Sequence, residues 1–193
     1  MDITLIRHAE TTPTPWKNGM GVGRNIAMWP RQATGEFDVL IATAEVSGTV
    51  PFSSYPGVDR SLLVTAGRLL LKSTHRETLL SKDSEPLVFA GEEKIIGTAI
   101  GGEIVQDFNV LSKRGVVHHT LARWEVPALG REISASGSLL VHIQEGQAKV
   151  LCEAFEAQLH AGDTVIISEL SGQTCSVKSI GHAICIVGDI EYL

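Results

Sequence analysis

The sequence contains few of the features that mark secreted, membrane or nucleic-acid-binding proteins. Its 193 residues include only three cysteines, Cys152, Cys175 and Cys185, in no CxxC arrangement, so we expect free thiols in a reducing cytoplasm. No apolar run approaches the roughly 20 residues of a membrane helix, and the N-terminus lacks the pattern of a signal peptide. The net charge is -6 and basic residues come singly or in pairs, which argues against nucleic acid as a partner.

The seven histidines also lack the spacing of a metal-binding cupin barrel. Such a barrel uses two histidines at alternate positions of a strand, because that spacing places both imidazoles on one face. Here no His-x-His is present, and the neighbouring His118 and His119 would point to opposite faces of a strand. The G-x-S-x-G sequence of a nucleophile elbow is absent as well. We therefore expect no metal, no other cofactor and no catalytic nucleophile.

Short apolar or alternating runs, separated by turn-forming residues, dominate the chain. This pattern, with 19 glycines, predicts an all-β fold, and a helical turn or two is expected only at 74–81 and 153–159. The sequence Ser-Leu-Leu-Val occurs at 61–64 and again at 138–141, which favours two related units. We predict two tandem barrels, a first unit at 1–126 and a smaller second unit at 127–193. The N-terminal strand could pair with the second unit.

Two stretches rich in glycine or proline contain candidate ligand-binding residues. Residues 15–24 read Pro-Trp-Lys-Asn-Gly-Met-Gly-Val-Gly-Arg, where Lys17 offers a cation and Asn18 offers both a donor and an acceptor. Residues 51–60 read Pro-Phe-Ser-Ser-Tyr-Pro-Gly-Val-Asp-Arg, and Arg60 stands at a strand entrance with donors arranged to suit a carboxylate. Each stretch could equally be an ordinary surface loop, with Arg60 in an exposed ion pair.

A third stretch, Gly-Gly-Glu-Ile-Val-Gln-Asp-Phe-Asn-Val-Leu at 101–111, predicts a strand that is buried on both faces. Alternation along a strand places Asp107 and Asn109 on one face, beside Val105 and Leu111. A carboxylate and an amide on a buried face need hydrogen-bonding partners. A ligand pocket or a buried structural network would supply them, and both alternatives stay open.

In order and spacing, the three stretches resemble the HutD family of bicupins, which includes Ves. The similarity spans nearly all of the first 115 residues, and Ala-Glu-Val at 44–46 also fits. The resemblance implies two cupin-like (jelly-roll) barrels without a metal centre, which bind an intermediate of histidine utilisation such as urocanate or formylglutamate and limit flux. The chain departs from the family where Met20 replaces a glycine and Asn25-Ile26 replaces Glu-Ile, so its ligand could differ.

The chemistry of the three stretches fits a small carboxylate. Lys17 and Arg60 could neutralise the carboxylate, with Arg60 binding in a bidentate manner. Asp107 and Asn109 could hold a polar or nitrogenous end of the ligand, or Asp107 could neutralise Arg60 in the empty site. Aromatic side chains could form the pocket wall. The predicted ligand-binding residues are Lys17, Asn18, Phe52, Tyr55, Arg60, Asp107 and Asn109.

The predicted function is therefore metal-independent binding of a small carboxylate that regulates histidine utilisation. One alternative is a metal-free enzyme acting on an imidazole-derived acid, with Asp107 as general base. Another is a stress-related protein-interaction module. Neither nucleic acid nor a membrane is an expected partner, and the spare sheet edges of a bicupin permit a homodimer.

Overall fold

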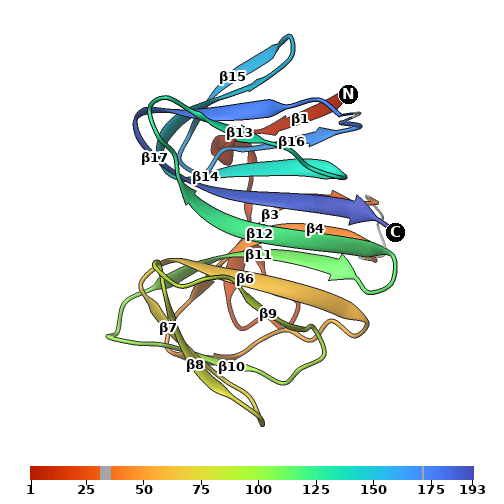
Figure 1. The fold of residues 1–193 in the computed structure, drawn as a ribbon. Coiled ribbons are helices and arrows are strands. Elements are labelled where there is room, and N and C mark those ends of the chain that lie inside the picture. Colours follow the sequence, from red (N-terminus) through yellow and green to blue (C-terminus); the bar gives the residue numbers. More distant parts are fainter. Residues whose placement is uncertain (31–35, 171) are drawn as a thin grey trace. The chain divides into compact units, whose positions relative to one another are not determined.

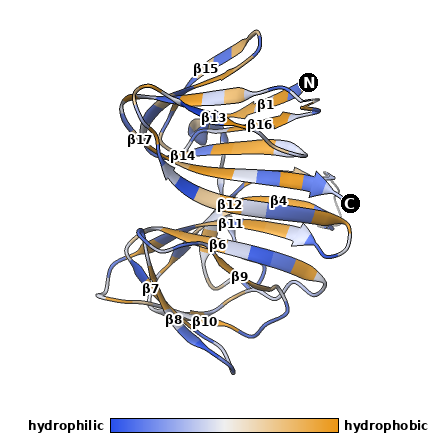
Figure 2. Cartoon of the chain, in the orientation of Figure 1, coloured by the Kyte–Doolittle hydropathy of each residue, from blue (hydrophilic) through white to orange (hydrophobic). Residues whose placement is uncertain are grey.

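The prediction of an all-β chain is confirmed by the computed structural model, which describes residues 1–30, 36–170 and 172–193 (Figure 1). In these ranges the only helical segment is one 3-10 turn, η1 (His8–Glu10). None of the described helical segments has the length and apolar character that crossing a membrane requires. The strands alternate between hydrophobic and hydrophilic segments, which is typical of sheets with one buried face (Figure 2).

The described strands fall into two compact units. One unit comprises residues 12–117, and the other comprises residues 1–11 together with 118–193. The sequence placed the boundary at 126/127 instead, and the difference arises because β12 (Val117–Glu125) pairs with β17 (Cys175–Tyr192) of the second half. The N-terminal strand β1 (Asp2–Ile6) pairs antiparallel with β16 (Thr164–Ser168), so it belongs to the sheet of that half as well.

The unit of residues 12–117 contains a six-stranded and a four-stranded sheet. The six-stranded order is β2-β3-β4-β11-β6-β9, and the four-stranded order is β5-β10-β7-β8. Apolar side chains from both sheets, such as Leu62, Leu69 and Val105, form one buried cluster. The strands of the larger sheet are β2 (Pro13–Pro15), β3 (Val22–Trp29), β4 (Val39–Val46), β6 (Val58–Ala66), β9 (Leu87–Ala90) and β11 (Val105–Lys113). Those of the smaller sheet are β5 (Thr49–Pro51), β7 (Arg68–Lys72), β8 (Glu77–Ser81) and β10 (Ile96–Ala99).

Strand β11 occupies the centre of the six-stranded sheet and is buried on both faces from Asp107 to Ser112, as predicted. It pairs antiparallel with β4 on one side and β6 on the other. In this register Leu111 lies opposite Arg60, and Asn109 lies opposite Leu62. Because side chains alternate along paired strands, Arg60, Asn109 and Asp107 share one face of the sheet. Strand pairing thus joins two of the stretches that the sequence singled out.

The other unit contains a seven-stranded sheet in the described residues. Its main order is β1-β16-β14-β17-β12, with β13 (Arg131–Ile133) on β17 and β15 (Phe155–His160) on β14. The long strand β14 (Ser138–Cys152) pairs with β17 along most of its length. Both strands contribute to an apolar core, as Val141, Val150 and Val177 show.

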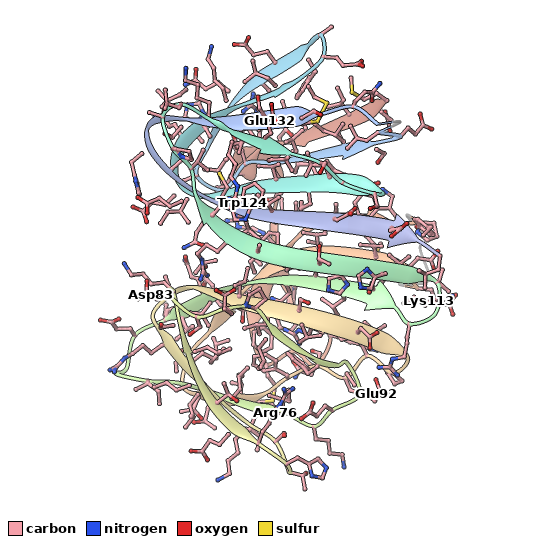
Figure 3. All side chains as sticks on the ribbon, in the orientation of Figure 1. Arg76, Asp83, Glu92, Lys113, Trp124 and Glu132 are labelled. Carbon is pink, nitrogen blue, oxygen red and sulfur yellow. A yellow bond between two sulfur atoms is a disulfide. The ribbon has the colours of Figure 1, made fainter. Side chains whose placement is uncertain are left out.

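The helical turns expected at 74–81 and 153–159 are wrong. The structure has strands there: β8 pairs with β7, and β15 pairs with β14. Each segment is short and only weakly periodic, so it finds a neighbouring strand whose backbone groups satisfy its own. Charged side chains such as that of Glu92 lie outside the core (Figure 3). Glu92 is in an ion pair with Arg114.

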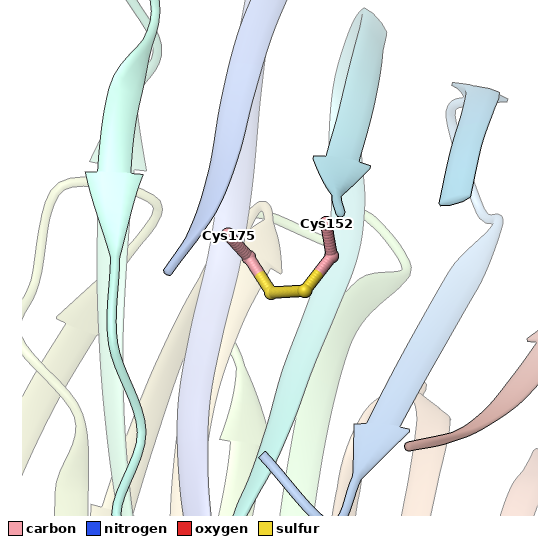
Figure 4. Close-up of a disulfide and its surroundings, with 2 residues drawn as sticks. All are labelled: Cys152 and Cys175. Atoms are coloured by element: carbon pink, nitrogen blue, oxygen red, sulfur yellow. A yellow bond between two sulfur atoms is a disulfide. The ribbon is translucent and has the colours of Figure 1, made fainter. Parts of the chain in front are cut away.

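The expectation of free thiols is wrong for two of the three cysteines. Cys152 on β14 and Cys175 on β17 lie directly opposite each other and form a disulfide, with Cα atoms 4.3 Å apart (Figure 4). Cys185 is a free, buried thiol, and burial raises its pKa to about 12. The separation of 23 residues gave no signal, because strand pairing decides which cysteines meet.

Reducing this disulfide is expected to destabilise the unit that contains it. A cross-link over a separation of 23 residues lowers the conformational entropy of the unfolded chain. This raises the free energy of unfolding by about 3 kcal/mol. Urea unfolding of the wild type with and without reductant measures the effect, and the double variant Cys152→Ala/Cys175→Ala is the control because reductant should not change its midpoint. A wild-type midpoint that reductant leaves unchanged would contradict the disulfide.

Candidate ligand-binding site

A cavity of about 620 Å³ lies on one face of the six-stranded sheet, within the unit of residues 12–117. Its floor consists of side chains and backbone at positions that share this face of β3, β4, β6 and β11. These floor residues are Gly23, Asn25, Met28, Leu40, Ala42, Ala44, Arg60, Asn109 and Leu111. The walls include Thr14, Pro15, Trp16, Lys17, Glu36, Phe37, Phe52, Ser53 and Tyr55.

Arg60 is the buried cation of this cavity, with 8% of its surface exposed. Its Nε and Nη2 both donate hydrogen bonds to Oδ1 of Asn109, at 2.9 and 2.7 Å. The guanidinium carbon lies 4.7 Å from the ring centroid of Phe52 and 5.4 Å from that of Phe89. These contacts fix the guanidinium plane and leave Nη1 with no hydrogen-bond partner among the described residues.

Asn109 connects Arg60 to a second buried charge. Its Nδ2 donates a hydrogen bond of 2.5 Å to Oδ1 of Asp107, which is fully buried. The other carboxylate oxygen, Oδ2, has no hydrogen-bond partner in the described structure. Burial raises the pKa of Asp107 to about 6, while the positive charge of Arg60 acts in the opposite direction. The side-chain amide of Asn109 therefore bridges the guanidinium of Arg60 and the carboxylate of Asp107.

The loop between β2 and β3 forms one side of the cavity and is fastened by Asn18. The Asn18 Nδ2 donates to the carbonyl oxygen of Pro51 at 2.8 Å, and its Oδ1 accepts from the backbone N–H of Met20 at 3.1 Å. Lys17 donates to the carbonyl oxygen of Ser54 at 3.4 Å, and its Nζ lies 5.1 Å from the ring centroid of Tyr55. Met20 is half-exposed and does not line the cavity, so its side chain makes no direct contribution to the cavity wall.

Aromatic rings form the adjoining wall because two glycines leave room for them. Trp16 and Phe52 meet edge to face, with ring centroids 5.8 Å apart. A Cβ atom at Gly97 would lie 2.5 Å from the Phe52 ring, and one at Gly21 would lie 2.6 Å from the Trp16 ring. Any larger residue at either position would displace a ring of the cavity wall. Burial of Tyr55 also raises the pKa of its hydroxyl, which keeps this part of the wall neutral.

The structure brings most of the predicted residues to one cavity. Lys17, Phe52, Tyr55, Arg60 and Asn109 line it, whereas Asn18 and Asp107 do not. Asn18 fastens the neighbouring loop, and Asp107 lies behind Asn109. Sequence reasoning assigned no ligand contact to several further lining residues: Thr14, Asn25, Met28, Glu36, Phe37 and Ser53. Alternation along β3 could have pointed to Asn25. Met28 faces the same side of the sheet as Asn25 only because a β-bulge follows Asn25, and the sequence gives no sign of that bulge.

None of the histidines in the described residues lines the cavity. Within residues 1–30, 36–170 and 172–193, no group of three or more His, Cys, Asp or Glu side chains could hold a metal ion. His142, in the other unit, is buried and hydrogen-bonded through Nδ1 to the hydroxyl of Thr164 at 2.8 Å. Burial lowers the pKa of His142 to about 3, so its imidazole is neutral at physiological pH.

Comparison with solved structures shows the fold. HutD from Pseudomonas fluorescens superposes with a TM-score of 0.85 at 21% identity, covering 100% of both chains. A Cupin 2 conserved barrel domain protein from Leptotrichia buccalis gives a TM-score of 0.61 at 10% identity, covering 99% of this chain and 98% of that one. Both comparisons establish a cupin-like all-β fold.

Comparison of sequences shows the family. Protein Ves of Citrobacter koseri is 32% identical over 100 residues, which make up 51% of this chain and 52% of that protein. The chain thus spans about half the length of the curated relatives that it matches. The family model described as HutD, in contrast, matches residues 8–185. The chain therefore belongs to the HutD family.

Proposed function

We propose that this chain binds a small carboxylate metabolite of the urocanate or formylglutamate class, without a metal, and thereby regulates flux through histidine utilisation. Membership of the HutD family suggests the connection with histidine utilisation. The observation that carries the carboxylate assignment is Arg60, a buried guanidinium in the cavity floor whose Nη1 has no partner in the described structure. Nη1 is not fully buried, so a ligand in the cavity can supply an acceptor for a charge-assisted hydrogen bond from it.

The composition of the cavity supports an anionic ligand with an apolar or planar body. Arg60 lies in the floor and Lys17 at the wall, whereas Glu36 is the only acidic residue among the lining side chains that the structure describes. The aromatic rings of Trp16 and Phe52 cover the side next to Arg60. A few fixed polar groups in an apolar cavity are typical of small-molecule sites. Arg60 would hold the carboxylate through its Nη atoms, and the rings would contact the rest of the ligand.

The enzyme alternative receives less support from this geometry. A general base must come within hydrogen-bond reach of the proton that it removes. Asp107 does not line the cavity, and the Asn109 side chain is hydrogen-bonded to both Asp107 and Arg60.

The finer organisation of the protein is also part of the proposal. We infer that each unit is a cupin-like barrel, with the carboxylate site in the unit of residues 12–117. A cytoplasmic location and a homodimer stay predictions. The disulfide between Cys152 and Cys175 does not support the cytoplasmic prediction, because that prediction assumed reduced thiols.

Thermal unfolding with a panel of small carboxylates tests the proposal. The panel comprises urocanate, formylglutamate, histidine, imidazole-propionate and glutamate, each paired with the amide of its carboxyl groups as control. A ligand at 100 times its Kd should add about 2.7 kcal/mol to the free energy of unfolding. We expect at least one carboxylate to stabilise the protein and its amide to have little effect. Equal stabilisation by acid and amide, or none by any acid, would refute carboxylate recognition.

A further inference from the structure

The buried chain of Arg60, Asn109 and Asp107 has an unusual arrangement for an ion pair. Both charged groups are on the inner face of the six-stranded sheet, yet each is hydrogen-bonded to Asn109 and not to the other. Asp107 is fully buried and does not line the cavity, and one of its carboxylate oxygens has no partner in the described structure. A ligand in the cavity can therefore contact Arg60 without contacting Asp107.

Burial disfavours the ionised form of Asp107, and the positive charge of Arg60 favours it. Strands β4 and β6 flank β11, and their charged side chains are Glu45, Asp59 and Arg60. Glu45 and Asp59 pair with Gln106 and Ser112, which face the opposite side of the sheet, and Asp59 is in an ion pair with Arg114. The smaller sheet contributes apolar residues such as Leu69 and Leu71 to the cluster next to this face.

We propose that capture of a carboxylate by Arg60 is coupled to the uptake of a proton by Asp107. This inference rests on the proposed function, since it requires an anionic ligand on Arg60. In the empty site, Asp107 is the counter-ion of Arg60. A bound carboxylate takes over that neutralisation, and two carboxylates would then share one buried cation. Two like charges around one cation disfavour the second ionised form, so a proton from solvent binds to Asp107, whose Oδ2 has no hydrogen-bond partner in the described structure.

The direction of the pH dependence follows from linkage. The pKa of Asp107 is about 6 in the empty site, and the ligand raises it further. Between the pKa of the empty site and the higher pKa of the complex, binding consumes protons, so affinity falls as pH rises. A rise of one unit in the pKa on binding lowers the affinity about tenfold from the acidic to the alkaline side of this window. Below pH 6, Asp107 is already protonated in the empty site and the coupling disappears.

Isothermal titration of the full chain with benzoate tests the coupling. Benzoate combines a carboxylate for Arg60 with a planar apolar ring for the cavity, and it stays ionised from pH 6 to pH 8. Titrations at one pH in phosphate and in Tris, buffers with different ionisation enthalpies, give the number of protons taken up. For a rise of one unit in the pKa, we expect uptake of a fraction of a proton near pH 7 and about a fivefold increase in Kd from pH 6 to pH 8.

Two variants assign the proton to its site. Asp107→Asn retains an acceptor oxygen for Asn109 but does not titrate, so its Kd should be constant with pH and its proton uptake zero. Glu36→Gln removes an exposed carboxylate from the cavity wall and should leave the uptake unchanged. If Asp107→Asn does not fold, the wild type and Glu36→Gln are compared in the two buffers. Equal proton uptake by both would exclude Glu36, a carboxylate that lines the cavity, and loss of uptake in Glu36→Gln would overturn the assignment to Asp107.

The outcomes separate the two proposals. Benzoate binding with a constant Kd and no proton uptake would overturn the coupling and leave carboxylate recognition standing. Proton uptake that persists in Asp107→Asn would also overturn the coupling, because it would place the proton elsewhere. Failure of benzoate and of every carboxylate in the metabolite panel to bind would overturn both proposals.

Discussion

Replacing Arg60 with methionine is expected to abolish carboxylate binding at micromolar ligand. Arg60 is the buried guanidinium in the cavity floor, and methionine keeps much of the apolar stem but no donor. Loss of one partner from a buried, charge-assisted hydrogen bond costs about 2–5 kcal/mol, or about 30-fold or more in Kd. Arg60→Lys should restore little of this affinity, because an ammonium cannot donate to Asn109 and to a carboxylate in the same planar, bidentate geometry.

Controls distinguish lost recognition from lost folding. The double variant Arg60→Met/Asp107→Asn leaves no unpaired charge in the interior, so it should fold and still fail to bind. Lys17→Met removes the exposed cation at the cavity wall and should change the binding free energy by about 1 kcal/mol or less. Titration calorimetry with the carboxylate that stabilises the wild type measures all four variants. Binding by folded Arg60→Met with the wild-type Kd would exclude Arg60 as the carboxylate contact.

Replacing Asn109 with alanine is expected to cost about 3–5 kcal/mol in the free energy of unfolding. Asn109 accepts two hydrogen bonds from Arg60 and donates one to Asp107, so its loss leaves groups of both buried ions without partners. Buried charged groups without hydrogen bonds are more costly than the bonds themselves are stabilising. Urea unfolding at pH 7.5, where Asp107 is mostly ionised, measures the change.

Asn25→Ala is the matched control for Asn109→Ala. Both asparagines line the cavity, but the side chain of Asn25 is exposed, so its removal should change stability by about 0.5 kcal/mol or less. A loss below about 1 kcal/mol for Asn109→Ala would mean that the two buried ions find other partners, in conflict with the central role of the Asn109 amide.

The sequence predicted most of the local structure that builds the site. Period-two alternation at 101–111 placed Asp107 and Asn109 on one face of a strand that is buried on both sides, and the structure has this arrangement in β11. The face of each side chain could be predicted from the sequence because alternation along a strand depends only on neighbouring residues. The helical turns expected at 74–81 and 153–159 were wrong, because the periodicity was weak and the strands that pair with these segments lie elsewhere in the chain.

The sequence by itself determined the all-β class, the HutD resemblance and the presence of candidate cations at 17 and 60, since these follow from composition, spacing and residue type. Only the tertiary structure decided which of these groups meet. The register of β6 on β11 placed Arg60 beside Asn109, with Asp107 behind it, and the pairing of β14 with β17 joined Cys152 to Cys175. The physical reason is that contacts across a sheet depend on strand order and register, which residues far apart in the chain fix together.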